Sequence, residues 1–148
     1  MEVVMAVSGP FVVDVAQQFP FGLALVSEIT KSLEYDPGVK REERRQDRDK
    51  DTGLPLWECS VLDLDPSVSY EGKTFVVRIA SDVQPVAPAA VPGAPLRTVQ
   101  VDGMRITVRT KVTGRNWKTK EDKVSAVFYV TATGISAVKA GSDGSKAA

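Results

Sequence analysis

The chain has 148 residues, of which 43% are apolar and 26% are charged, and its 19 basic residues balance its 19 acidic ones. This is enough apolar material for one domain with a hydrophobic core. The absence of histidine excludes Ser-His and Cys-His nucleophiles, and the single cysteine excludes an intrachain disulfide.

The N-terminal segment has the features of neither a signal peptide nor a membrane span. Residues 1–4 lack a basic region, and Pro10, Asp14 and Pro20 interrupt the apolar run that follows. A bilayer-spanning helix needs about 20 apolar residues. Together with the lone cysteine, this predicts a soluble, cytoplasmic protein without membrane partners. We expect residues 1–17 to form an N-terminal extension or a first strand.

Strand patterns then surround a charged segment. Residues 22–35 are rich in Leu, Val and Ile and contain no proline, which predicts a strand. Residues 38–48 are rich in Glu and Arg but have no apolar stripe for helix docking, so we expect a loop or a long hairpin tip. In residues 56–64, Trp57 and Cys59 alternate with polar positions, which indicates a strand with Trp57 in the core.

Residues 73–80 form the next alternating strand, with Phe75, Val77 and Ile79 on one face. The following segment, 82–96, contains four prolines and should be an extended connector.

The Asp102-Gly103 pair then predicts a tight hairpin turn, because glycine tolerates positive φ. Strands are expected at 104–112 and 124–132, separated by a loop at 113–122. We expect disorder in the small, polar residues 136–148.

These elements predict an all-β protein with about five strands. Long loops between short strands favour a small, five-stranded, OB-like barrel over residues 18–135, as a single domain. A β-sandwich is the alternative.

Catalytic and metal-binding patterns are weak. Cys59 has apolar neighbours and is expected in the core, and no glycine-rich phosphate loop is present. Asp47, Asp49, Asp51 and Glu58 have the acid spacing of an EF-hand loop, but its sixth position is threonine instead of glycine, and no helices flank it. We therefore expect no enzyme, metal or cofactor.

Basic residues concentrate late in the chain. Residues 97–123 contain 8 bases and 3 acids, whereas residues 1–70 contain 7 bases and 13 acids. A basic surface beside an aromatic ring suits single-stranded nucleic acid, since cations follow the phosphates and the ring stacks on a base. The candidate contact residues are Arg105, Arg109, Lys111, Arg115, Trp117 and Lys118, with Arg48 and Lys50 beside them. Tyr129 is a further surface candidate. The alternative is a solvated strand face whose cations pair with acids of the 41–51 loop.

Several motifs follow one another in a family-like order. They are Arg48-Asp49-Lys50-Asp51-Thr52-Gly53-Leu54-Pro55-Leu56-Trp57, Val61-Leu62-Asp63-Leu64-Asp65, Val83-Gln84-Pro85-Val86, Pro92-Gly93-Ala94-Pro95-Leu96, Val101-Asp102-Gly103-Met104 and Thr131-Ala132-Thr133-Gly134. Over residues 18–135 the chain resembles the replication, integration and excision activators of actinobacterial plasmids and integrative elements. The resemblance implies a role in switching such an element towards excision and replication. It implies no catalytic or DNA-contacting residue.

Two functions follow from these patterns. The first is a nucleic-acid-binding accessory protein for replication, excision or transfer of a mobile element, with single-stranded DNA as the favoured partner. The second is a non-enzymatic adaptor that binds a replication or recombination protein through the proline-rich connector 83–95 and the 41–51 loop. Exposed strand edges leave homo-oligomerisation open.

Overall fold

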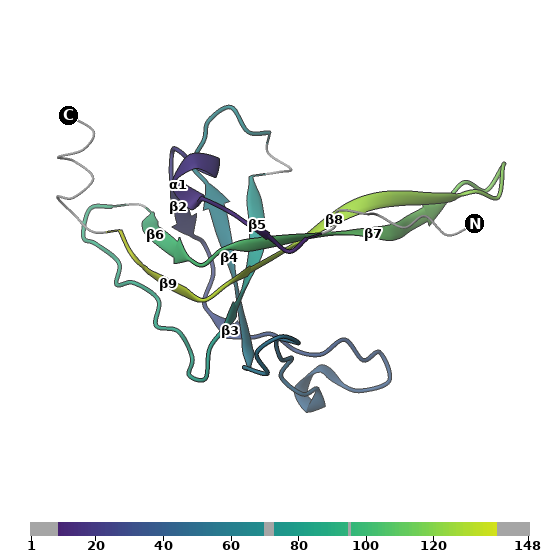
Figure 1. Ribbon diagram of the computed structural model, residues 1–148, viewed down its shortest axis with the longest axis horizontal. Coiled ribbons are helices and arrows are strands. Elements are labelled where there is room, and N and C mark those ends of the chain that lie inside the picture. Colours follow the sequence, from purple (N-terminus) through teal and green to yellow (C-terminus); the bar gives the residue numbers. More distant parts are fainter. Residues whose placement is uncertain (1–8, 70–72, 95, 139–148) are drawn as a thin grey trace.

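The computed structural model describes residues 9–69, 73–94 and 96–138, and it is an all-β protein (Figure 1). The strands are β1 (Phe11–Val12), β2 (Leu23–Leu25), β3 (Thr30–Lys31), β4 (Leu56–Asp63), β5 (Thr74–Ala80), β6 (Arg97–Asp102), β7 (Arg105–Arg115), β8 (Asp122–Ala132) and β9 (Gly134–Ala137). One helical turn, α1 (Val15–Gln18), and a 3-10 turn, η1 (Arg41–Glu43), complete the elements.

The strands form one curled, mostly antiparallel sheet that makes a half-barrel. Its order is β1-β7-β8-β5-β4-β2-β6-β9, and β3 pairs with β4 beside β2. The one parallel contact joins β5 to β8, over residues 77–79 and 130–132. Before residue 77 on β5 and residue 130 on β8, no pairing joins these two strands in the described ranges.

The core lies inside the curl, where the alternating apolar positions meet. Its members come from β2, β4, β5, β6 and β8, together with Ile29 just before β3 and Met104 just before β7. The least exposed large side chains are Leu23, Val61, Val77, Ile79 and Met104. Trp57 is 8% exposed, and its indole Nε1 donates a 2.9 Å hydrogen bond to the Ser81 carbonyl. The predicted core position of Trp57 is therefore confirmed.

The predicted strand over 22–35 is wrong, because the chain breaks it into β2 and β3. Both strands pair with β4, but the register changes by two residues between them. At the break, the Ser27 hydroxyl accepts a 2.7 Å hydrogen bond from the Ser60 amide and so replaces a backbone carbonyl of the ladder. The side chain of a serine can compete with the backbone in this way.

The prediction of a tight hairpin at Asp102-Gly103 is also wrong. β6 and β7 do not pair with each other, since β6 pairs with β2 and β9, while β7 pairs with β8 and β1. Gly103 has a φ of +62°, as a tight turn requires, but here the turn is a corner within one long ribbon. The pairs Asp102–Gly134 and Arg105–Thr131 belong to the same register, so β6–β7 and β8–β9 form one bent hairpin.

The other predicted segments agree with the structure except at the C-terminal end. Strands β4, β5, β7 and β8 lie within one to three residues of their predicted bounds, and residues 83–94 contain neither helix nor strand. The 38–48 segment is a loop apart from η1 and the isolated bridges of Gln46 with Leu33 and of Arg48 with Pro55. The prediction of disorder from residue 136 is wrong for Ser136 and Ala137, because both pair with β6 as part of β9, and the part beyond residue 138 lies outside the described residues.

Candidate nucleic-acid interface

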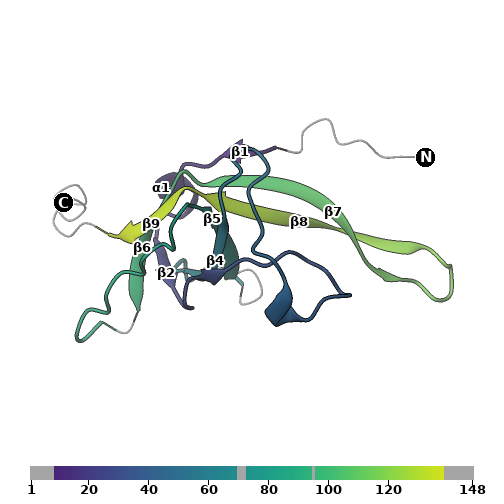
Figure 2. The ribbon, with the colours of Figure 1, turned by 90° about the horizontal axis from the view of Figure 1, so that it is seen from below.

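The outer half of the β7–β8 ribbon projects from the body as an arm, which we define as residues 108–128. Figures 1 and 2 show it extending away from β6 and β9 in two perpendicular views. No side chain that the structure describes between residues 110 and 126 is buried. The apolar residues Val112 and Phe128 are accordingly exposed.

A compact turn closes the arm. The Asn116 amide donates to the Glu121 carbonyl at 2.7 Å, and the Lys120 amide donates to the Asn116 carbonyl at 2.7 Å. The Asn116 side-chain oxygen accepts from the amides of Lys118 and Thr119. This turn holds Trp117 away from the body.

Trp117 is 75% exposed, and the Lys118 ammonium lies 5.4 Å from the centre of its ring. The Arg115 guanidinium donates a 3.2 Å hydrogen bond to the Lys120 carbonyl, which places a second cation beside the turn. An exposed indole with neighbouring cations is suited to stacking on a base next to a phosphate.

Along β7, Arg105 and Arg109 are exposed and alternate with the apolar face of the strand. Lys111 is two residues further on and its backbone pairs with Ser125 on β8. Neither Arg105 nor Arg109 forms an ion pair with any carboxylate in the described ranges. The alternative interpretation, in which acids of the 41–51 loop neutralise these arginines, has no contact to support it in those ranges.

Arg78, Arg109 and Tyr129 form a cluster on the same outer face. The sequence predicted Arg109 and Tyr129 as surface candidates but not Arg78. Tyr129 of β8 lies between two guanidinium groups, with the central carbon of Arg109 4.8 Å and that of Arg78 5.6 Å from the centre of its ring. The cluster therefore joins β5, β8 and β7. Sequence alternation showed that Arg78 faces away from Val77 and Ile79, but the parallel β5–β8 contact that brings it to Tyr129 could not be derived from local patterns.

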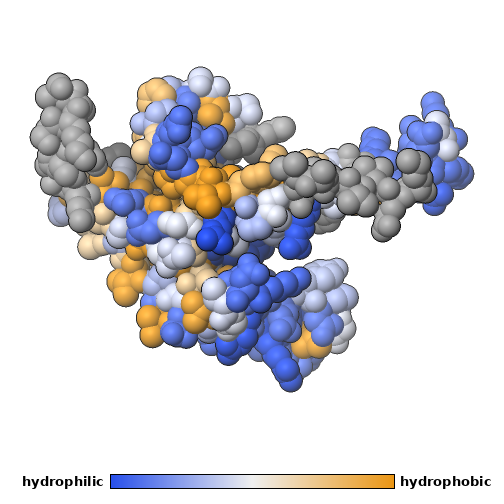
Figure 3. Space-filling model, in the orientation of Figure 1, coloured by the Kyte–Doolittle hydropathy of each residue, from blue (hydrophilic) through white to orange (hydrophobic). Residues whose placement is uncertain are grey.

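Arg48 and Lys50 lie on a second projection, the loop between β3 and β4. Both are exposed, and the Arg48 guanidinium donates a 2.8 Å hydrogen bond to the Gly53 carbonyl. Asp49 caps the same turn by accepting from the Thr52 hydroxyl at 2.7 Å. Figure 3 shows open space between this hydrophilic loop and the hydrophilic end of the arm. No hydrogen bond or ion pair joins Arg48 or Lys50 to the described residues of the arm.

Cys59 has the environment of a core residue. It is 2% exposed, and burial, with a smaller contribution from the charge of Glu58, raises the pKa of its thiol from 9.0 to about 11. A thiol with so little thiolate at neutral pH is a poor nucleophile.

The acids of the EF-hand-like spacing do not converge. Asp49 binds Thr52, and Asp47 accepts from the amide of Arg48. Within the described ranges, no group of three or more Cys, Asp or Glu side chains is arranged to hold a metal ion.

No family model, curated protein or solved structure matches this chain. None of the helices in the described part of the chain has the length and apolar character needed to cross a membrane.

Proposed function

We propose that this protein binds single-stranded nucleic acid, with single-stranded DNA as its ligand, along the outer face of the arm and the adjoining body. The observation that carries the proposal is the cluster of Arg78, Tyr129 and Arg109, in which two guanidinium groups lie 5.6 Å and 4.8 Å from the centre of one aromatic ring and form no ion pair with a carboxylate in the described ranges. Arg105 lies four residues before Arg109 on β7, nearer the body, and Trp117 lies at the far end. Cations at intervals can follow a phosphate backbone while the exposed Trp117 ring stacks on a base.

The strand connections support an OB-like barrel. When β6–β7 and β8–β9 are each counted as one strand and the two-residue strands β1 and β3 are set aside, five strands remain, which are β2, β4, β5, β6–β7 and β8–β9. OB folds bind oligonucleotides with the face of their second and third strands and with the loops after the first and fourth strands. The equivalents here are the β4–β5 face, the loop that contains Arg48 and Lys50, and the arm turn that contains Trp117 and Lys118.

The motif resemblance supplies a biological setting for this activity. We place the protein in the cytoplasm of an actinobacterial host, as an accessory factor for replication, excision or transfer of a plasmid or integrative element. Each of these processes exposes single-stranded DNA.

An adaptor that binds a replication or recombination protein is the second candidate. It is favoured by the connector between β5 and β6, where Val83, Val86 and Val91 are each more than 60% exposed. Apolar side chains on an extended, proline-rich segment are a recognised mode of protein binding.

Fluorescence anisotropy with labelled single-stranded and duplex oligonucleotides, at low and physiological salt, tests the proposal. We expect a preference for the single strand and an affinity that falls steeply with salt, because each phosphate contact releases counterions. Binding to neither ligand at low salt would remove the proposal and leave the adaptor.

Charge reversal at one arm residue locates the site. Arg109→Glu should weaken binding and lower the salt slope by about 1, as expected for one lost phosphate contact. Lys31→Glu is the matched control, because it makes the same change of charge at an exposed residue. Lys31 pairs with Trp57, so it lies on the opposite face of the sheet from Arg78. Equal losses in the two variants would indicate attraction by net charge without a defined site.

A further inference from the structure

Beside the stacked arginines, two strands diverge and leave their edges open. Residues 74–76 of β5 pair with β4 on one side, and residues 127–129 of β8 pair with β7 on one side. Between them, the β5–β8 contact ends at residues 77 and 130, so the facing sides have no strand partner among the described residues. Unpaired edges present backbone N–H and C=O groups to any extended chain that enters.

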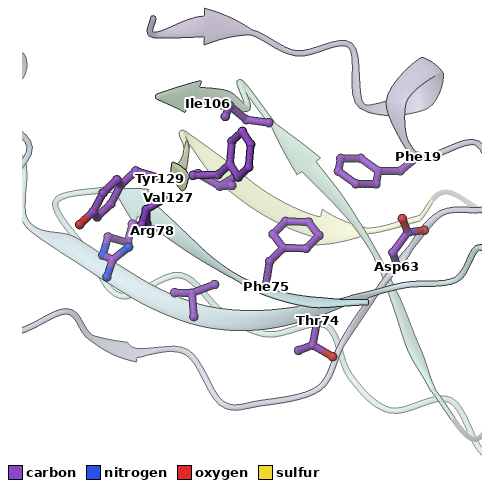
Figure 4. Close-up of a pocket in the computed structure, with 11 residues that line it drawn as sticks. Phe19, Asp63, Thr74, Phe75, Arg78, Ile106, Val127 and Tyr129 are labelled. Carbon is purple, nitrogen blue, oxygen red and sulfur yellow. The ribbon is translucent and has the colours of Figure 1, made fainter. Parts of the chain in front are cut away.

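The space between the edges is a cleft of about 580 Å³ with an apolar floor. Phe19 and Phe75 stack there with ring centres 5.5 Å apart, and Ile106 and Phe128 line the same cleft. Phe128 is 63% exposed and adds apolar surface at the β8 side of the cleft. Figure 4 shows Phe19 and Phe75 on one side of the cleft and Arg78 and Tyr129 together on the other.

The two sides of the cleft suit the two faces of a β-strand. Side chains of an inserted strand alternate, so one set would meet the phenylalanines and the other would meet the outer face. That outer face carries Arg78 and Arg109, which have no carboxylate partner in the described ranges. Asp63, the acid that lines the cleft, lies apart from Arg78 in Figure 4 and accepts from the Asp65 amide.

We propose that the β5–β8 cleft binds an extended, acidic peptide segment of a partner protein, which adds as a strand to the open edge of β5. Its apolar residues cover Phe75 and Phe128, and its acidic residues pair with Arg78 and Arg109. Strand addition derives affinity from backbone hydrogen bonds and specificity from alternate side chains. The site shares its two arginines with the proposed nucleic-acid face but depends, in addition, on the β5 edge and the apolar floor.

Three short fluorescein-labelled peptides test this proposal by anisotropy. The first alternates aspartate with phenylalanine or leucine. The second has lysine in place of aspartate, and the third is the first peptide with alternate backbone nitrogens methylated. We expect binding of the first peptide alone, with a loss of at least about tenfold on methylation, because the N-methyl groups remove the donors that a strand needs. Amide shifts in two-dimensional NMR spectra should centre on residues 74–76.

Phe128→Ser should weaken the acidic peptide several-fold while leaving oligonucleotide binding unchanged. Val112→Ser is the matched control, because Val112 is a similarly exposed apolar residue of the arm outside the cleft. Equal binding of the methylated peptide would overturn the proposal, as would equal effects of the two substitutions. Shifts at residues 74–76 caused by the oligonucleotide instead of the peptide would also overturn it and would assign the cleft to nucleic acid.

Discussion

The two tryptophans of this chain occupy opposite environments. Trp57 is buried with its indole N–H bonded to Ser81, whereas Trp117 is held in the open by the turn at the end of the arm. An indole that is exposed in the folded protein contributes little to the core, and its ring face is open to a ligand. This contrast makes Trp117 the aromatic residue on which nucleic-acid binding can be tested without disturbing the core.

Trp117→Ala should reduce the binding free energy for single-stranded DNA by about 1–3 kcal/mol, the range for loss of one base-stacking ring. Trp117→Tyr should retain most of the affinity, since a smaller ring still stacks. Phe21→Ala, at another exposed aromatic residue away from the arm, is the control. Titrations by anisotropy at one fixed salt concentration measure all three, and an unchanged affinity in Trp117→Ala would exclude stacking at the arm turn.

Cys59 links burial to the pH dependence of stability. Its thiol pKa is about 11 in the folded protein against an ordinary value of 9.0. Below pH 9 both states keep the proton, so the residue contributes no pH dependence. Between pH 9 and 11 the unfolded state loses the proton while the native state retains it, and stability falls by up to about 1.4 kcal/mol per pH unit.

Urea unfolding of the native sequence and of Cys59→Val, each at pH 8 and pH 10, checks this expectation. The native sequence should lose more stability than the variant over that interval, because the variant has no thiol to ionise. All other side chains are the same in both proteins, so the comparison isolates the thiol. Equal losses would mean that the thiol ionises as readily in the folded state as in the unfolded one.

At the scale of elements, the corner at Gly103 allows one ribbon to serve both the body and the arm. The Thr133 amide donates to the Asp102 carbonyl at 2.8 Å, and the Thr133 hydroxyl donates to the same oxygen at 3.1 Å. A Cβ at position 103 would lie 2.5 Å from the Thr133 hydroxyl oxygen. Glycine is therefore required twice here, once for its positive φ and once for the close approach of Thr133.

Gly103→Ala should destabilise the fold by about 2–3 kcal/mol, since it combines left-handed backbone strain with a steric clash. Gly53→Ala is the matched control: Gly53 has a φ of +73° but nothing within 4 Å of the added Cβ. It should cost only about 1 kcal/mol. Urea unfolding measures the loss of stability in both variants. Equal losses would show that the Thr133 side chain can move away from the added Cβ without destabilising the fold.

Strand positions could be predicted from sequence wherever alternation was local, as in β4 and β5. The corner could not, because Asp-Gly with positive φ fits a hairpin and a bend in a ribbon equally well. Only the pairing of β6 with β2, about 70 residues away in the chain, decides between them. The β2–β3 break was missed for a similar reason, since it depends on a hydrogen bond between Ser27 and the distant Ser60.

At the scale of the whole molecule, the body and the arm have separate roles. The core cluster draws on β2, β4, β5, β6 and the body end of β8, while the described arm residues beyond residue 109 on β7 and before residue 127 on β8 contribute none of its members. We therefore expect that the folded state does not depend on the arm end, so that the proposed binding can be removed without unfolding the protein.

Joining Arg109 directly to Val127 through Asn-Gly, in place of residues 110–126, tests this separation. These two residues are paired in the ribbon, so a two-residue turn can connect them. We expect a free energy of unfolding within about 1 kcal/mol of the full chain, because no described side chain in the removed segment is buried. Removal of the segment should lower the affinity for single-stranded DNA, which anisotropy measures. Loss of cooperative unfolding would show that the arm supports the body.

The candidate site was predictable in part for the same reason as the fold. Arg105, Arg109 and Trp117 stand out because strand alternation and polar neighbours expose them in any β fold. Arg78 becomes part of the site only through the parallel β5–β8 contact, which joins residues more than 50 positions apart. Local charge patterns also gave no sign that the loop with Arg48 and the arm would project separately.

The alternation of side chains along the bent ribbon restricts how the arm can vary in length. Side chains alternate between the cationic and apolar faces, so loss of one residue from β7 alone would exchange the two faces beyond that point. Loss of one residue from each strand would exchange the faces of both strands, so the faces are kept only when two opposing pairs are lost or gained together, or when the change lies within the closing turn at 116–121. Homologous arms should therefore differ in reach by steps of two residue pairs, and a bulge such as the one between Val112 and Gly114 marks where an unpaired residue has been accommodated.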